Sequence, residues 1–171
     1  MKMKKEKGML IKLDLSKAYD RLNWRYLEAI LQAFGFCDRW VKWVLSMIST
    51  PNFSILLNGA PSITFNASRG LRQGDPLSPF LFIIAVERLG RYFKKELRER
   101  KIQGLRLWGN QTTVTHQHFV DDIMIYCKVS LNEVRRIKRI LEVFMKGSGM
   151  EVNNEKSRTF FSIQWNPSKI I

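Results

Sequence analysis

Three aspartates have the residue type and the placement for metal-dependent chemistry. Asp14 lies near the end of an apolar segment, and Asp121 and Asp122 lie side by side far along the chain. If the two segments are neighbouring strands, the carboxylates converge, and they repel one another unless a cation neutralises them. Carboxylate oxygens suit magnesium, which often shares its ligand shell with substrate phosphates. Converging carboxylates of this kind could hold two magnesium ions, or manganese in their place, for phosphoryl transfer.

Other patterns have plainer interpretations. An adjacent aspartate pair is also common in a polar turn. His116 and His118 would share one face of a strand and could form a metal pair, but the sequence offers no third ligand nearby. Cys37 and Cys127 form neither a disulfide framework nor a zinc spacing, so we expect both to be buried small hydrophobic residues in a reducing compartment.

In the first half of the chain, a strand is followed by two helices. Residues 8–15 have the composition of a buried strand. Asn23 is the expected cap of a helix that stops at Gly35, and Asp38 the expected cap of a second helix that ends before Pro51. Their apolar faces would be formed by Leu27, Ile30, Leu31 and Phe34, and by Val41, Val44, Leu45 and Ile48.

Two hairpins and two further helices are expected after residue 51. Residues 53–57 and 62–67 flank the turn signal at 58–61, and a polar, glycine-rich loop follows at 68–76. Ser78 and Pro79 would open a helix that reaches roughly Lys101.

The second hairpin would have strands near 113–119 and 123–129, with residues 120–122 at its tip. Ser130 and Glu133 would form a capping box for a last helix, followed by a strand. Its inward residues would be Val134, Ile137, Leu141 and Phe144. This element order predicts an α+β fold, in which helices pack on one face of a largely antiparallel sheet.

Composition points to a polyanionic partner. Lysine and arginine number 29 against 15 acidic residues, which gives a formal net charge of +14. Nucleic acid is the polyanion that best matches such an excess, although charge alone specifies no function. The basic residues within 88–101 are interleaved with glutamates, so they form either a solvated helix face or a contact with a nucleic-acid backbone. No segment predicts a signal peptide or a membrane span, and no localisation signal is clear.

Four segments together resemble the motifs of reverse transcriptases from non-LTR retrotransposons of the long interspersed element type, as found in plants. KLDLSKAYDRLNW at 12–24 is similar to motif A, and RGLRQGDPLSPFLF at 69–82 to motif B. FVDDIMIY at 119–126 is similar to motif C, and MEVNNEKS at 150–157 to motif D. The resemblance covers nearly the whole chain and implies a right-handed polymerase palm that performs RNA-directed DNA synthesis.

The resemblance also implies roles for individual residues. Asp14 and Asp121 would be the principal magnesium ligands, with Asp122 as the accessory carboxylate of motif C. Tyr19 matches the aromatic gate that excludes a ribose 2′-hydroxyl, and Lys156 matches the motif D general acid that protonates the departing pyrophosphate.

In motif B, Gln73 and Gly74 match the pair that contacts the incoming nucleotide and the template strand, and Arg69 and Arg72 would contact phosphates. The implied partners are an RNA template, a DNA primer and deoxynucleoside triphosphates, without a membrane. The natural context would be a longer polyprotein with an endonuclease.

Two departures from the family pattern bear on activity. Val120 stands where motif C usually has a smaller residue, so the hairpin tip would be bulkier. We expect residues 1–171 to be one partial palm domain that lacks the upstream fingers motifs and the downstream thumb. Three hypotheses follow: an RNA-directed DNA polymerase, a catalytically inactive remnant that still binds nucleic acid, and, least favoured, a maturase-like RNA-binding protein.

Overall fold

Two compact units make up the chain. The computed structural model describes residues 8–106, 113–119 and 122–162. The first unit comprises Met1–Ser16, Glu87–Lys146 and Glu151–Ile171, and the second comprises Lys17–Val86 and Gly147–Met150. Within the described ranges, no helix has the length and apolarity that a membrane span requires.

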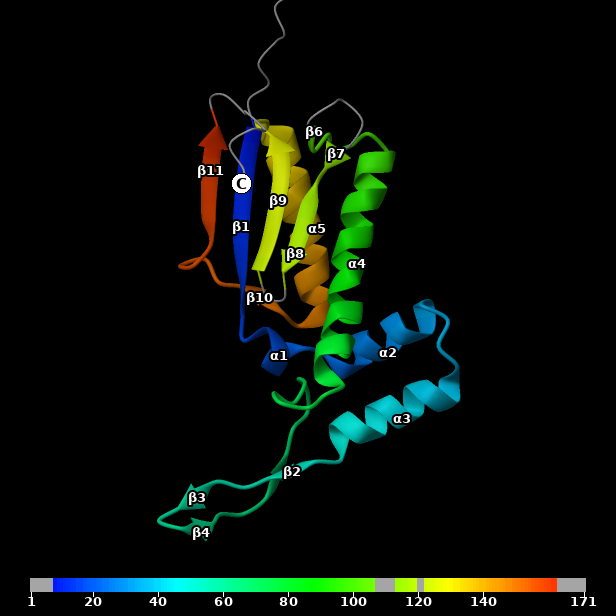
Figure 1. Ribbon diagram of the computed structural model, residues 1–171, viewed down its shortest axis with the longest axis vertical. Coiled ribbons are helices and arrows are strands. Elements are labelled where there is room, and N and C mark those ends of the chain that lie inside the picture. Colours follow the sequence, from blue (N-terminus) through cyan, green and yellow to red (C-terminus); the bar gives the residue numbers. More distant parts are fainter. Residues whose placement is uncertain (1–7, 107–112, 120–121, 163–171) are drawn as a thin grey trace, which may run out of the picture. The chain divides into compact units, whose positions relative to one another are not determined.

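The first unit is built on an antiparallel sheet of five strands (Figure 1). Strand β1 is central: it pairs with β9 on one side and with both β11 and β10 on the other, and β8 pairs with the far side of β9. The strands are β1 (Gly8–Ser16), β8 (His116–Phe119), β9 (Asp122–Lys128), β10 (Glu151–Val152) and β11 (Arg158–Ser162). A separate pair joins β6 (Leu105–Arg106) and β7 (Thr113–Val114).

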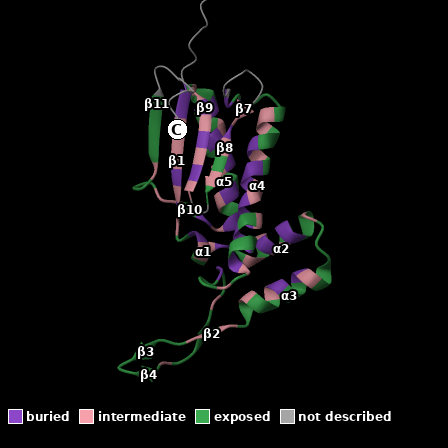
Figure 2. Cartoon of the chain, viewed as in Figure 1, coloured by how far each residue is buried: buried purple, intermediate pink, exposed green. Residues whose placement is uncertain are grey.

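Helices cover one face of this sheet. Helix α5 (Leu131–Ser148) lies behind β9 in Figure 1. The Glu87–Arg98 part of helix α4 (Ser78–Arg98) runs beside β8, where Phe93 stacks on His116. Along β1 and β9 the residues that point toward the helices are buried, for example Leu13 and Ile125, while their neighbours are half-buried, an alternation visible in Figure 2. The two faces of the sheet therefore differ: one is part of the core, and the other is open.

The second unit contains three helices, the start of α4 and one long hairpin. The helices are α1 (Ala18–Arg21), α2 (Trp24–Ala33) and α3 (Asp38–Ser49). The hairpin strands are β2 (Asn52–Phe53), β3 (Leu56–Leu57), β4 (Ala60–Pro61) and β5 (Phe65–Asn66), with β2 paired to β5 and β3 to β4. Asn58 and Gly59 at its tip both have positive φ, 50° and 84°, as a type I′ turn requires.

Several predictions are confirmed residue by residue. The Asn23 side chain accepts hydrogen bonds from the backbone of Arg25 and Tyr26, so it caps α2. Gly35 has φ 88° just after that helix. The first hairpin turns where Asn58-Gly59 predicts it, and the sheet is antiparallel as expected.

Three predictions at helix starts are wrong. Asp38 is the first residue of α3, and the N-cap is Cys37, which is exposed and not a buried hydrophobic residue. The Glu133 carboxylate does not reach back to Ser130; it accepts hydrogen bonds from the backbone N–H groups of Gln103 (3.1 Å) and Lys128 (3.2 Å). This buried carboxylate therefore joins α5 to two other segments, and burial raises its pKa.

The inward face of α5 and the second hairpin also differ from expectation. Val134 is 37% exposed, because the buried stripe is rotated toward Glu133, Ile137, Ile140 and Phe144. The predicted strand 113–119 is divided at Thr115, since its first part pairs with β6 and its second with β9. Asp122 belongs to β9, opposite Phe119, and not to the hairpin tip. Helix α4 ends at Arg98, short of Lys101.

Candidate active site

The open face of the sheet brings two of the predicted carboxylates together. Asp14 on β1 lies directly opposite Asp122 on β9 in the antiparallel register, so both side chains emerge on the same face. Both residues are half-buried. Asp121, predicted as a principal metal ligand, and Val120 lie outside the described residues.

The charges at this position fit a cation. Two like charges directly opposite each other destabilise a strand pair. Lys12, two residues before Asp14, forms an ion pair with the Asp122 carboxylate at 2.9 Å. The Asp14 carboxylate has no ion pair or hydrogen bond with any described residue, and no third metal-binding side chain joins the pair within the described ranges. An oxygen-only site with an uncompensated carboxylate suits a hard divalent cation.

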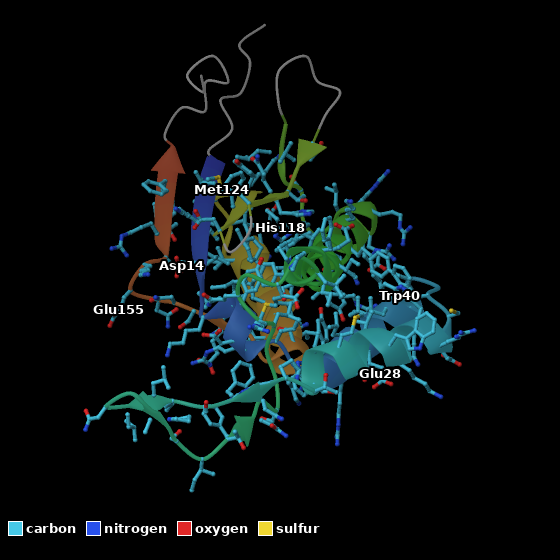
Figure 3. The ribbon with its side chains drawn as sticks, turned by 60° about the horizontal axis from the view of Figure 1, so that its bottom comes forward. Asp14, Glu28, Trp40, His118, Met124 and Glu155 are labelled. Carbon is cyan, nitrogen blue, oxygen red and sulfur yellow. The ribbon has the colours of Figure 1, made fainter. Side chains whose placement is uncertain are left out.

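Hydrogen bonds tie the turn that carries Lys156 to the backbone of Asp14; Figure 3 labels Asp14 and Glu155, the neighbour of Lys156 in that turn. The Asn153 N–H donates to the Asp14 carbonyl at 2.8 Å, and the Asp14 N–H donates to the Ser157 hydroxyl at 3.3 Å. The Asn153 side chain in turn accepts from the N–H groups of Glu155 and Lys156. These bonds hold the predicted general acid in a turn that is fixed against the strand of the predicted metal ligand.

In the second unit, the glycine-rich loop at 69–75 is bound to the turn between α1 and α2. The Leu71 N–H donates to the Tyr19 carbonyl at 2.7 Å, and the Trp24 indole donates to the Gly70 carbonyl at 2.6 Å. The Gly70 N–H donates to the Leu22 carbonyl at 2.8 Å. The loop therefore has a fixed backbone in spite of its glycine content.

This loop lines a hollow of about 490 Å³. Arg69, Arg72 and Gln73, three of the predicted substrate-binding residues, all border it. The Gln73 side-chain amide also lies 3.4 Å from the Asp20 carboxylate. Gly74 has φ +86° with open space where a side chain would be, so backbone conformation and not crowding within the chain favours glycine there.

Tyr19 is held by an aromatic neighbour. Its ring stacks on Phe82 at 4.7 Å with an interplanar angle of 9°, and the residue is half-buried. One face of the tyrosine ring is thus fixed by packing. Its role as a gate stays a prediction.

The histidine pair lies on the core face of β8. His116 stacks on Phe93, and its Nδ1 is 2.9 Å from the Thr115 hydroxyl. The His118 ring contacts His116 edge-on at 5.1 Å, and neither of its buried ring nitrogens has a hydrogen-bond partner among the described residues. Because the described ranges supply no third ligand, the pair has the surroundings of core residues and not of a metal site.

Replacing His118 with leucine should raise the free energy of unfolding by about 1 kcal/mol at neutral pH, because it removes buried polar atoms that have no partner. His116→Leu is the matched comparison, and it should be destabilising, since His116 has both a hydrogen-bond partner and a stacking partner. Urea unfolding of both variants checks the prediction. Equal effects in the two variants would contradict it.

The same pair should make stability depend on pH. Burial lowers the pKa of His116 to about 4 and also lowers that of His118, with Lys94 adding to both shifts and Glu87 opposing that of His118. The unfolded chain therefore binds protons first, so stability should be lost as the pH falls from about 6.5 toward 4. His118→Leu should reduce this loss.

Comparison with known proteins decides the family. The reverse transcriptase (RNA-dependent DNA polymerase) family model matches residues 1–168. The chain belongs to the reverse transcriptase family. Its curated relatives include the Pol polyprotein of the Drosophila melanogaster retrotransposable element R2DM and the transposon TX1 149 kDa protein of Xenopus laevis, each 30% identical over 147 residues. An uncharacterized mitochondrial protein of Arabidopsis thaliana is 42% identical over 67 residues, which are 39% of this chain.

The reverse transcriptase chain is much shorter than its polyprotein relatives. The matches cover 86% of the chain but only 11% of the TX1 protein and 13% of the R2DM polyprotein, and the Arabidopsis match covers 55% of that protein. Among solved structures, telomerase from Candida tropicalis is similar in fold, with a TM-score of 0.71 and 16% sequence identity. The alignment covers 92% of this chain and 26% of the telomerase chain. For telomerase from Candida albicans, the alignment covers 94% of this chain and 28% of the telomerase chain, with a TM-score of 0.69 and 16% identity. The predicted α+β polymerase palm fold is confirmed.

Three residues of this reverse transcriptase site escaped the sequence analysis: Lys12, Asn153 and Ser157. The two turn residues carried a signal, because Asn-Asn before Glu-Lys-Ser is typical of a side-chain-capped turn. Only the register of β1 against β9 reveals that Lys12 reaches Asp122.

Removing this ammonium group should strengthen cation binding. Lys12→Met is expected to raise the affinity for Mn²⁺ about tenfold, since a neighbouring positive charge competes with the ion for Asp122. Electron paramagnetic resonance of free Mn²⁺ measures this, with Lys138→Met, an exposed change on α5, as the control. Weaker binding by Lys12→Met would instead show that Lys12 positions the carboxylate.

Proposed function

We propose that this chain is the palm portion of an RNA-directed DNA polymerase, which extends a primer 3′-hydroxyl with deoxynucleotides. The observation that carries the proposal is the direct opposition of Asp14 and Asp122 on the open face of the sheet, in a chain of the reverse transcriptase family. Two carboxylates placed directly opposite each other repel, and a bound cation removes that repulsion, so the arrangement favours a cation site.

Asp14, Asp121 and Asp122 would hold two magnesium ions, with manganese as an alternative. When bound, the ions would supply charge stabilisation for the attacking 3′-oxygen and the departing pyrophosphate. Lys156 would give a proton to the pyrophosphate. Its exposed position in the turn fixed to Asp14 leaves the ammonium group free to approach a ligand on that side of β1.

Substrate recognition is proposed for the second unit. Arg69 and Arg72 would bind phosphates, and Gln73 with Gly74 would contact the incoming nucleotide and the template. Tyr19, held against Phe82, would leave no room for a 2′-hydroxyl and so select deoxynucleotides. The polyprotein relatives support an RNA template and a longer natural context.

The test is extension of a labelled DNA primer on an RNA template, with deoxynucleotides and Mg²⁺. Wild type should extend the primer and Asp121→Ala should not, whereas Asp38→Ala, an exposed carboxylate at the start of α3, should match wild type. If wild type and both variants bind RNA but none extends the primer, the result would favour the second candidate, an inactive remnant that keeps nucleic-acid affinity. The observation that supports this candidate is the net charge of +14.

A further inference from the structure

A basic groove lies on the helical side of the first unit, between the end of α4 and the first turns of α5. Its volume is about 490 Å³, and every lining side chain is basic or an amide. The lining residues are Arg100, Lys101, Asn132, Arg135, Arg136 and Arg139. A groove with no apolar or aromatic lining lacks the anchors that protein interfaces usually bury.

The backbone at Arg100 is strained. The Arg100 N–H donates to the Leu97 carbonyl and the Lys101 N–H to the Glu96 carbonyl, which is the hydrogen-bond pattern of a Schellman helix end. Arg100 occupies the position that normally requires glycine, with φ 56°. An arginine in this left-handed conformation is less stable than a glycine would be. Backbone strain of this kind often occurs at functional sites, so we infer that the Arg100 side chain has a function.

Three of the five basic side chains that line the groove form no ion pair with a described carboxylate. Lys101 forms ion pairs with Glu96 and Glu99, and Arg136 pairs with Glu96 at 3.6 Å. Arg100, Arg135 and Arg139 are exposed and form no ion pair with any described carboxylate. Guanidinium groups bind phosphates through paired N–H donors, so three unpaired ones in one groove suit successive phosphates of a strand.

The groove and the aspartates lie on opposite sides of the sheet. Helix α5 lies against the core face of β1 and β9 (Figure 1). The strand register and the alternation of buried residues place Asp14 and Asp122 on the other face. We propose that the groove binds the phosphodiester backbone of an RNA segment separate from the strand being copied. The proposal rests on the proposed function only for the choice of RNA as the polyanion. A bound RNA would thus be held at two places at once, which raises the effective concentration of its copied segment.

Binding of a fluorescent single-stranded RNA in EDTA, without nucleotides, tests the groove. Arg135→Gln/Arg139→Gln should weaken binding about tenfold and make the slope of log affinity against log salt shallower by about 1.4, at roughly 0.7 per phosphate contact. Lys138→Gln/Lys146→Gln removes the same charge from the same helix outside the groove and should weaken binding less than threefold. Equal losses in the two double variants would overturn the proposal.

Arg100→Gly tests the groove with a variant that should not destabilise the fold. It should leave the melting temperature unchanged or raise it, because glycine relieves the strain, while it weakens RNA binding severalfold. Unchanged RNA affinity would overturn the proposal, and so would displacement of the RNA by poly-L-glutamate at equal charge concentration. Asp14→Asn should retain groove binding, so failure of primer extension and failure of the groove are separately visible.

Discussion

Asp14→Asn should abolish Mg²⁺-dependent primer extension, with a loss of about a thousandfold or more, and should also make the metal-free protein slightly more stable. The loss of extension follows from the removal of a carboxylate that the proposed mechanism requires for cation binding. The gain in stability follows because Asp14 opposes Asp122 directly, so asparagine removes a repulsion of up to about 1 kcal/mol.

Primer extension and urea unfolding in EDTA measure the two effects. Asparagine has the same shape as aspartate, and the hydrogen bonds of residue 14 to Asn153 and Ser157 involve only its backbone, so the fold should be kept. Asp38→Asn is the matched control: it should leave primer extension unchanged and should not raise stability, because the Asp38 carboxylate lies in the first turn of α3. A variant that lost activity together with stability would point to a structural role for the carboxylate.

Gly70→Ala should lower the free energy of unfolding by about 3 kcal/mol. A Cβ at this position would lie 2.7 Å from the Asp20 carbonyl oxygen, and φ is +89°, so alanine meets both a backbone clash and a disfavoured conformation. The loop at 69–75 would have to leave the α1–α2 turn, and the hydrogen bond from Trp24 would be lost with it.

The control for Gly70→Ala separates the clash from the conformation. Gly35 has φ +88° but open space at the Cβ position, so Gly35→Ala should cost only about 1 kcal/mol. Urea unfolding of both variants measures the difference. Equal costs would mean that the close approach of Gly70 to Asp20 contributes nothing.

Local signals in the sequence predicted the elements well where one residue decides the geometry. Asn23 caps a helix and Asn58-Gly59 turns a hairpin because each acts on its immediate neighbours. The predicted capping box at Ser130 and Glu133 is absent because Glu133 makes tertiary hydrogen bonds instead. The carboxylate satisfies N–H groups of Gln103 and Lys128, and Gln103 lies thirty residues away in sequence.

The candidate site could be predicted in residue type but not in arrangement. The motifs named Asp14 and Asp122, while their pairing depends on the register of two strands that no local pattern fixes. Lys12 looked like one basic residue among many, because its contact with Asp122 exists only after the strands pair. Arg100 was expected inside a helix, and the strain that marks it depends on where α4 ends.

Iron-directed cleavage locates the proposed metal site without requiring polymerase activity. Fe²⁺ with ascorbate and peroxide, in place of Mg²⁺, generates hydroxyl radicals that cut the backbone near the bound ion. The proposed site predicts cuts in β1 around Asp14 and at the start of β9 around Asp122, suppressed by excess Mg²⁺ and absent in Asp14→Asn. Cuts at other segments, or cuts at these two that persist in Asp14→Asn, would contradict a metal-dependent site on the open face of the sheet.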